Sequence, residues 1–140
     1  MTNNMKLSFP AKAENEALAS MAISAFLVPL DPSVADMSDV KTAVSEAVTN
    51  SIIHAYGEDG QGVVVMSAWY ENNRLYIEIE DFGMGICDLQ KALTPMYTSK
   101  PDSERSGMGF TIMETFMDNL DVVSTPGKGT VVKMLKIISP

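Results

Sequence analysis

The hydrophobic pattern of the chain changes its period between residues 57 and 63. Before this point, apolar side chains recur every three or four residues over residues 13–27 and 36–56, which predicts two amphipathic helices. After it, residues 63–70 form a β-branched and aromatic run, and residues 75–80 alternate apolar side chains with Tyr or Glu, as paired strands do. The chain therefore combines a helical segment with a sheet.

Weaker signals complete the order of elements. The Asn72-Asn73 pair predicts a hairpin turn between the two strands that flank it. Further elements are expected as a strand over residues 5–9, a helix over 110–117, and a second hairpin over 120–124 and 130–138. The outer edge of the first strand could pair with another chain. This order predicts one α+β domain over residues 1–140, a two-layer sandwich whose mixed, mostly antiparallel sheet is covered on one face by helices.

Charge and cysteine content narrow the class of protein. The net charge of −8, with 18 acidic and 10 basic residues, would repel a nucleic-acid backbone, so no direct nucleic-acid binding is expected. Cys87 is the only cysteine, which excludes an internal disulfide and a cysteine-rich metal site. Residues 21–30, the most apolar stretch, are too short to span a bilayer, and the N-terminus lacks an export signal. We expect a cytoplasmic protein without a membrane partner.

The helix predicted over residues 36–56 carries a polar line in apolar surroundings. Glu46, Asn50 and His54 follow one another at intervals of four residues, and Glu46 is the only charged residue from 42 to 57. The roughly opposite stripe consists of Val40, Val44, Val48, Ser51 and Ala55. A solvated helix face normally carries several charges, and buried carboxylates or amides need partners. The line therefore predicts a polar ligand or metal at Glu46 and Asn50, whereas His54 alone is more often structural.

Two glycine-containing segments have the character of a nucleotide site. Asp81 ends a predicted strand and precedes Gly83 and Gly85, which permit close approach of a ligand, and its carboxylate can accept a hydrogen bond from a base amine. Residues 94–109 lack a hydrophobic period, as lids do, and end in Ser-Gly-Met-Gly at a helix start, where free amides suit phosphate oxygens. An ordinary turn explains either segment alone equally well. Together with the polar helix line, they favour a nucleotide site.

The order and spacing of these segments resemble the ATPase superfamily of gyrase and histidine kinases. Within it, three blocks are similar to the anti-sigma F factors of spore-forming bacteria, a family of serine protein kinases: Ser45-Glu-Ala-Val-Thr-Asn50, Thr98-Ser-Lys-Pro101 and Arg105-Ser-Gly-Met-Gly-Phe-Thr-Ile-Met-Glu114. The likeness covers essentially the whole chain. It implies a Bergerat-type α/β ATP-binding fold, ATP or ADP with Mg²⁺, and a homodimer. It also implies two partners, a sporulation sigma factor that is held inactive and an anti-anti-sigma antagonist protein that is phosphorylated on serine.

The same resemblance implies roles for individual residues. Asn50 would be the magnesium ligand, Asp81 would accept the hydrogen bond of the adenine amine, and Glu46 would polarise the attacking serine hydroxyl. Lys100 and Arg105 lie in the lid, where a cation could meet the γ-phosphate, although both could simply be solvated. The other implied nucleotide-binding positions are Gly83, Gly85, Thr98, Gly107, Gly109 and Thr130.

Three alternative functions stay open on the sequence alone. The first is the equivalent kinase of the general stress response, and the second is a nucleotide-dependent binding module without transferase activity. The third, a detached histidine-kinase catalytic domain, is weakened because little chain precedes residue 36 to form a phospho-acceptor hairpin. Two positions depart from the family resemblance: Ser20 stands where relatives tend to have a basic residue facing the partner, and Cys87 replaces a common proline.

Overall fold

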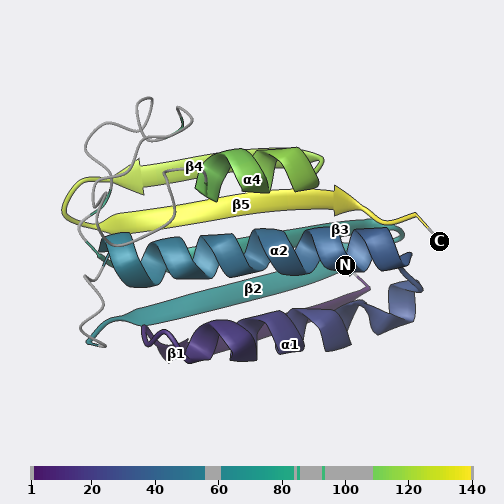
Figure 1. Cartoon of the computed structure of the whole chain (residues 1–140), viewed down its shortest axis with the longest axis horizontal. Helices are drawn as coiled ribbons and strands as arrows, with labels where there is room; N and C mark the ends of the chain where they lie inside the picture. Colours follow the sequence, from purple (N-terminus) through teal and green to yellow (C-terminus); the bar gives the residue numbers. More distant parts are fainter. Residues whose placement is uncertain (1, 56–60, 84, 86–92, 94–108, 140) are drawn as a thin grey trace.

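The protein is described by a computed structural model, which covers residues 2–55, 61–83, 85, 93 and 109–139. These residues form two layers, with helices covering one face of a five-stranded sheet (Figure 1). The strands are β1 (Asn3–Pro10), β2 (Val63–Glu71), β3 (Arg74–Asp81), β4 (Asn119–Thr125) and β5 (Gly129–Ile137). The helical segments are α1 (Asn15–Leu27), the 3₁₀ turn η1 (Val28–Leu30), α2 (Val34–Asn50), the π-helical turn η2 (Ser51–Ala55) and α4 (Gly109–Phe116).

The strands are ordered β1-β2-β3-β5-β4 across the sheet. Every pairing among them is antiparallel, so the expected mostly antiparallel sheet is confirmed. Two hairpins, β2–β3 and β4–β5, are joined side by side through β3 and β5, which places Asp81 opposite Thr130. Asn72 adopts a φ of 56° in the first hairpin turn, as the Asn-Asn pair predicts.

One face of β3 is buried against the helices and the other is half exposed. Leu75, Ile77 and Ile79 are fully buried, whereas the intervening Tyr76, Glu78 and Glu80 are only partly covered. Asp81 occupies the next position of the buried series and is 5% exposed. The strand period therefore directs a carboxylate into the interface between the sheet and the helices.

α2 lies between α1 and α4 on the covered face of the sheet (Figure 1). It begins at residue 34, two residues before the expected start, because Ser33 caps it: the Ser33 hydroxyl accepts a hydrogen bond from the amide of Asp36. No helix within the described ranges is long and apolar enough to cross a bilayer.

The hydrophobic core fills the space between these two layers. α1 contributes Ile23 and Leu27 and α2 contributes Val44 and Val48, all with no exposed surface. Burial of side chains of this size stabilises a fold by about 1.5–3 kcal/mol each. The core extends to α4 through Met113, so all three helices of the described chain are held on the sheet.

Lys136 ties three segments together at one end of this core. Its ammonium group donates to the carbonyl of Phe116 at the end of α4, at 2.7 Å, and to the carboxylate of Asp39 in α2, at 3.2 Å. It also lies 3.9 Å from the carboxylate of Asp36, which accepts a hydrogen bond from the amide of Ser139. A cation at the C-terminus of α4 complements the helix dipole, so this contact fixes α4 relative to α2.

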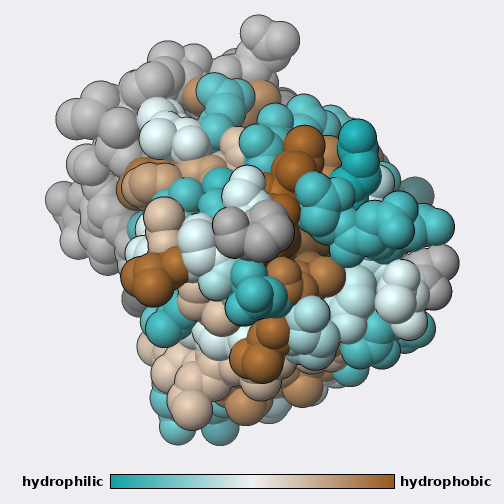
Figure 2. Space-filling view, turned by 90° about the vertical axis from the view of Figure 1, so that its right-hand side faces the viewer, coloured by the Kyte–Doolittle hydropathy of each residue, from teal (hydrophilic) through white to brown (hydrophobic). Residues whose placement is uncertain are grey.

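Both chain termini lie at this same end of the molecule, beside the β2–β3 turn. The amide of Thr2 donates to the carbonyl of Tyr70, and the amide of Ile138 donates to the carbonyl of Asn73. Figure 2 shows this end, where hydrophobic residues form separate small groups among hydrophilic ones. The segments that carry the predicted site residues lie at the other end.

Candidate functional site

The described segments that carry predicted site residues come together at the left-hand end of Figure 1. There α2 continues into η2, β3 ends, α4 begins, and β4 turns into β5. η2 contacts both β3 and β5, so the continuation of α2 beyond Asn50 lies against the sheet. A π-helical turn is uncommon and often occurs at functional sites.

Glu46 and Asn50 lie one helical turn apart at the C-terminal end of α2. Glu46 is 6% exposed, and Asn50 is partly exposed. The expectation that Glu46 is a buried charge, and not part of a solvated face, is therefore confirmed. His54 lies in η2, and its side chain is outside the described part of the structure.

The carboxylate of Asp81 accepts hydrogen bonds from both layers of the fold. The amide of Gly83 donates to Oδ1 at 3.1 Å, and the hydroxyl of Ser51, in η2, donates to Oδ2 at 3.1 Å. The first bond closes a turn over the glycine loop. The second joins the helix layer to the sheet. Together they fix the orientation of the one carboxylate that the sequence predicts to bind a base amine.

Burial is the main influence on the charge of Asp81. It raises the pKa of the Asp81 carboxyl from its ordinary value of 3.8, and the nearby charge of Glu80 raises it slightly more. Hydrogen bonds from the amide of Gly83, the hydroxyl of Ser51 and the amide of Thr130 oppose this shift. The fold thus keeps a carboxylate in an unfavourable place, as binding sites often do.

Gly109 brings the start of α4 against the polar helix line. A methyl group added there would lie 2.8 Å from Asn50 Nδ2 and 3.1 Å from Oδ1, closer than ordinary van der Waals contact. The glycine is therefore required for the amide of Asn50 to occupy its position. The glycine that ends the predicted lid thus meets the predicted magnesium ligand.

Gly85 and Gly129 bring the glycine loop against the β4–β5 turn. Gly85 has a φ of 76°, and a side chain there would collide with the carbonyl of Thr125 and lie 2.9 Å from the Cα of Pro126. Gly129 has a φ of 132°, and a side chain there would collide with the carbonyl of Asp81. Both positions need glycine for their backbone angle and for close packing. The β4–β5 turn therefore forms one wall beside the Asp81 carboxylate.

Thr130 continues this wall inside the sheet. It is 8% exposed and lies opposite Asp81 in the β3–β5 pairing. Its hydroxyl forms a 2.8 Å hydrogen bond with the hydroxyl of Ser124, which also donates to the carbonyl of Gly129 at 3.3 Å. Thr130, an expected nucleotide-binding residue, thus lies beside the expected adenine acceptor.

Part of the predicted site falls outside the described residues. Thr98, Lys100, Arg105 and Gly107 belong to this part, as does Cys87. Among the described residues, the structure brings together two groups at one end of the fold. The first group is Glu46, Asn50 and Gly109, and the second is Asp81, Gly83, Gly85 and Thr130.

Sequence reasoning missed Ser51 as a site residue. Its place in the valine stripe indicates a core position, and it is indeed 4% exposed. The signal that could have identified it is a hydroxyl in an otherwise apolar, buried stripe, because such a group requires a partner.

The described residues fit a nucleotide with magnesium. Asp81 offers a buried, fixed acceptor for an amine, and the glycine positions leave room where side chains would collide. No group of three His, Cys, Asp or Glu side chains in the described ranges could hold a metal. Magnesium binds readily through one or two protein ligands when phosphates and waters supply the rest, so Asn50 alone would suffice as the protein ligand.

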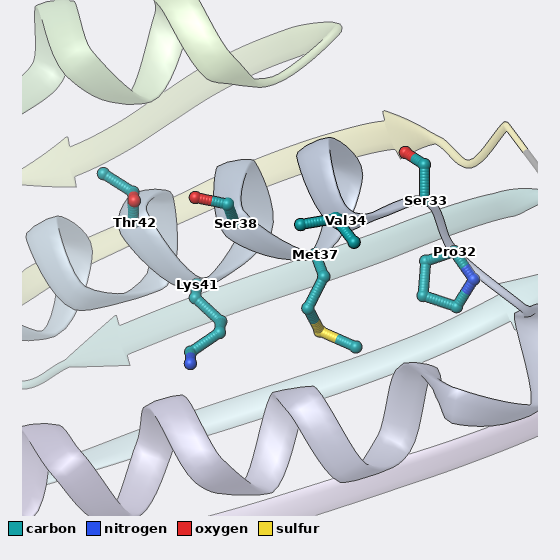
Figure 3. Close-up of a pocket in the computed structure, with 7 residues that line it drawn as sticks. All are labelled: Pro32, Ser33, Val34, Met37, Ser38, Lys41 and Thr42. Atoms are coloured by element: carbon teal, nitrogen blue, oxygen red, sulfur yellow. The ribbon is translucent and has the colours of Figure 1, made fainter.

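A separate shallow groove lies on the N-terminal half of α2, away from this site. Figure 3 shows Met37 and Lys41 directed towards α1, with Ser38 and Thr42 on another side of the helix. Asn50 and Gly109 lie at the opposite end of α2. The groove is therefore not part of the candidate nucleotide site.

Sequence comparisons connect this arrangement with known proteins. The family described as "Histidine kinase-like ATPase domain" matches residues 9–136. The anti-sigma F factor of Thermoanaerobacter sp. (strain X514) is 50% identical over 137 residues, which cover 98% of this chain and 95% of that protein. The anti-sigma F factor of Clostridium perfringens (strain SM101 / Type A) is 53% identical over 136 residues, 97% of either chain.

A solved structure shows the same fold. It contains the RsbU and RsbW domains of Rv1364c from Mycobacterium tuberculosis and superposes with a TM-score of 0.73. The match covers 99% of this chain and 33% of that chain, at 16% sequence identity. The expected two-layer α/β architecture is therefore confirmed, whereas an identity this low carries no information about activity.

Proposed function

The chain belongs to the histidine kinase-like ATPase family and, within it, to the anti-sigma F factors, and from this premise we propose that it is a Mg-ATP-dependent protein serine kinase that also binds and inhibits a sigma factor. The observation that carries the kinase proposal is Glu46. It is a buried carboxylate, one helical turn before Asn50, at the end of the fold where Asp81 lies. Folding alone does not need a charge there, whereas a reacting hydroxyl does.

In this proposal, most of the site residues bind the nucleotide, and Glu46 acts in catalysis. Asp81 would hold the adenine amine, Asn50 would be the protein ligand of magnesium, and the amides around Gly109 at the start of α4 would face phosphate oxygens. ATP supplies the γ-phosphoryl group. Glu46 would accept a hydrogen bond from the serine hydroxyl of the protein substrate and orient it for transfer.

The contribution of Glu46 should appear in turnover more than in ATP affinity. A general base typically accelerates a reaction by about 10²–10⁴-fold. Phosphoryl transfer often has a loose transition state, in which the attacking oxygen carries little charge, so the lower part of this range applies. Glu46 touches the protein substrate in this proposal, and the nucleotide is held by other residues.

The name of the relatives, anti-sigma F factor, supports a sigma factor as one partner. We propose a sporulation sigma factor as the protein that is held inactive, and an antagonist protein as the one phosphorylated on serine. Ser20 on α1, where the resemblance leads us to expect a basic residue, donates to the carboxylate of Glu16 at 2.9 Å. The exposed part of α1 therefore has an altered charge pattern, which would change partner affinity. Both activities would operate in the cytoplasm.

A homodimer is part of the same proposal. β1 is an edge strand, and within the described ranges only β2 pairs with it. Edge strands offer unpaired amide and carbonyl groups to a second chain. Analytical ultracentrifugation of the purified protein should give the mass of two chains, and a single-chain mass would contradict this part of the proposal.

The kinase proposal is tested by separating turnover from binding. The protein is incubated with γ-labelled ATP and a purified antagonist protein, and phosphoserine is measured. Glu46→Gln should lower the transfer rate by about a hundredfold or more while leaving ATP affinity within about threefold. Glu71→Gln, at the distant β2–β3 turn, serves as the matched control and should leave both unchanged.

Two results would assign the protein to other functions. ATP binding without any phosphoprotein would favour a nucleotide-dependent binding module. Retention of a general-stress sigma factor, in place of a sporulation sigma factor, would favour the corresponding stress-response kinase. A pull-down carried out first with ATP and then with ADP, with identification of the retained proteins, distinguishes these outcomes.

A further inference from the structure

Ser51 interrupts the apolar stripe by which α2 and η2 face the sheet. Val40, Val44 and Val48 of this stripe have no exposed surface, and Ser51 is 4% exposed. An apolar residue would serve packing equally well in such a place. A buried hydroxyl, by contrast, must find a hydrogen-bond partner, so its presence points to the group that it contacts.

The contact of Ser51 is the carboxylate of Asp81. The Ser51 hydroxyl donates to Oδ2 at 3.1 Å across the interface between the layers, while the amide of Gly83 donates to Oδ1 at 3.1 Å. One bond comes from the helix layer and one from the loop, so rotation of the carboxylate about its Cβ–Cγ bond would break both. The amide of Thr130 is a third donor to this carboxylate, and an ionised carboxylate has about four lone-pair sites, so it can still accept a hydrogen bond from a ligand.

We propose that Ser51 is a positioning residue that determines base specificity: it holds the Asp81 carboxylate in the orientation in which that carboxylate accepts a hydrogen bond from the 6-amino group of adenine. The inference rests on the proposed function, because it assigns a task within the same nucleotide site. It adds a residue that the family resemblance does not identify.

The chemistry of the bases explains why orientation and charge both matter. Adenine carries an amine, a donor, at position 6, whereas guanine carries a carbonyl oxygen, an acceptor, at that position. An ionised, correctly oriented carboxylate attracts the adenine amine and repels the guanine carbonyl oxygen. Burial favours the protonated form of Asp81, and among the described residues the negative charge of Glu80 favours it too. The Ser51 hydroxyl opposes this tendency and also stops the rotation.

The test compares two nucleotides that differ only at position 6. Dissociation constants of Mg-ATP and of the magnesium complex of purine riboside triphosphate, which lacks the amine, are measured by calorimetry for the wild-type protein and for Ser51→Ala. Ser51→Ala should weaken ATP binding about threefold to tenfold and leave the amine-free nucleotide unchanged. Preference for ATP over GTP should fall in parallel.

Two further variants separate this role from a structural one. Ser51→Thr keeps the hydroxyl and should retain the ratio of the two dissociation constants. Ser24→Ala removes another partly buried helical hydroxyl, which donates to the carbonyl of Ser20 on α1, and should also leave the ratio unchanged. If Ser51→Ala weakened the binding of both nucleotides equally, or changed neither dissociation constant, the inference would be overturned. Failure of the wild-type protein to bind ATP would instead refute the proposed function itself.

Discussion

Gly109→Ala should detach the predicted magnesium ligand without unfolding the protein. The added methyl group would lie 2.8 Å from Asn50 Nδ2, and ordinary contact begins at 3.4 Å, so the amide must retreat by the difference of about 0.6 Å. The clashing atoms belong to the free end of a side chain, which can rotate away. An off-rotamer side chain costs about 0.5–1.5 kcal/mol. Alanine in the middle of a helix gains about 0.5–1 kcal/mol over glycine, and at most this much at the first residue of α4, so stability should change by less than about 1.5 kcal/mol.

The loss should appear in magnesium-dependent nucleotide affinity. Changing a residue that positions a metal ligand typically costs about ten- to a hundredfold in metal affinity or activity. Calorimetry with ATP in the presence of magnesium, and again with a chelator, isolates this part of the binding free energy. We expect magnesium to strengthen ATP binding much less in Gly109→Ala than in the wild-type protein. The affinity for metal-free ATP should stay nearly constant.

Gly127→Ala is the matched control. Gly127 has a φ of 81°, and an added methyl group would meet no atom within 4 Å. The strained backbone should lower the free energy of unfolding by about 1–2 kcal/mol without altering the effect of magnesium on ATP binding. An unchanged effect of magnesium on ATP binding in Gly109→Ala would refute the argument that the start of α4 positions Asn50.

Two further predictions concern stability. Asp81→Asn removes a buried charge that destabilises the folded protein. Burial raises the folded-state pKa of Asp81 above 3.8, so the wild-type protein bears this free-energy cost at neutral pH. The cost disappears as the pH falls through the folded-state pKa, because the carboxyl then becomes neutral. The nucleotide-free variant should therefore melt at a higher temperature than the wild-type protein at about pH 7, with a gain that shrinks towards about pH 4; a gain that is independent of pH would contradict the assignment. Lys136→Met should lower the free energy of unfolding in urea by about 1–3 kcal/mol, because the carbonyl of Phe116 and the carboxylate of Asp39 lose a partly buried cation. Lys133→Met, at an exposed position of the same strand, should change it by less than about 0.5 kcal/mol, and equal effects of the two variants would contradict a special role of Lys136.

Hydrophobic period and turn residues were sufficient to predict the order of the elements and most of their ends to within two residues. The exception is the helix expected over residues 36–56, which is α-helical only to Asn50 and continues as the π-helical turn η2. The remaining differences come from hydrogen bonds that a period does not report. α2 starts at Val34 because Ser33 caps it, and β1 continues beyond its apolar residues because Asn3 and Pro10 still face β2. α4 begins at Gly109, since glycine can start a helix as well as end a loop.

The polar line of α2 was the most informative signal for the site. The absence of other charges around Glu46 in the sequence predicted its burial, which the structure confirms. The sequence could not reveal that Gly109 contacts Asn50, because that contact depends on the packing of α4 beside α2. Nor could it reveal the bond between Ser51 and Asp81, because these residues lie 30 positions apart and meet only across the two layers.

Lys136 stabilises the other end of α4. It fixes the C-terminus of α4 to α2, whereas the N-terminus of α4 meets Asn50. α4 is therefore held at both ends against the helix that carries Glu46 and Asn50. A rigid frame of this kind supports a site in which a metal ligand and a base must keep their positions while other segments contact the nucleotide.

In the proposed function, the end of the fold around Asp81 binds the adenine of ATP. Calorimetric titration of the wild-type protein and of Asp81→Ala with Mg-ATP tests it most directly. The loss of a charged hydrogen-bond acceptor should cost about 1.5–3 kcal/mol, which corresponds to a tenfold to hundredfold weaker affinity in the variant. Equal affinities of the two proteins for Mg-ATP would contradict the assignment of the adenine site.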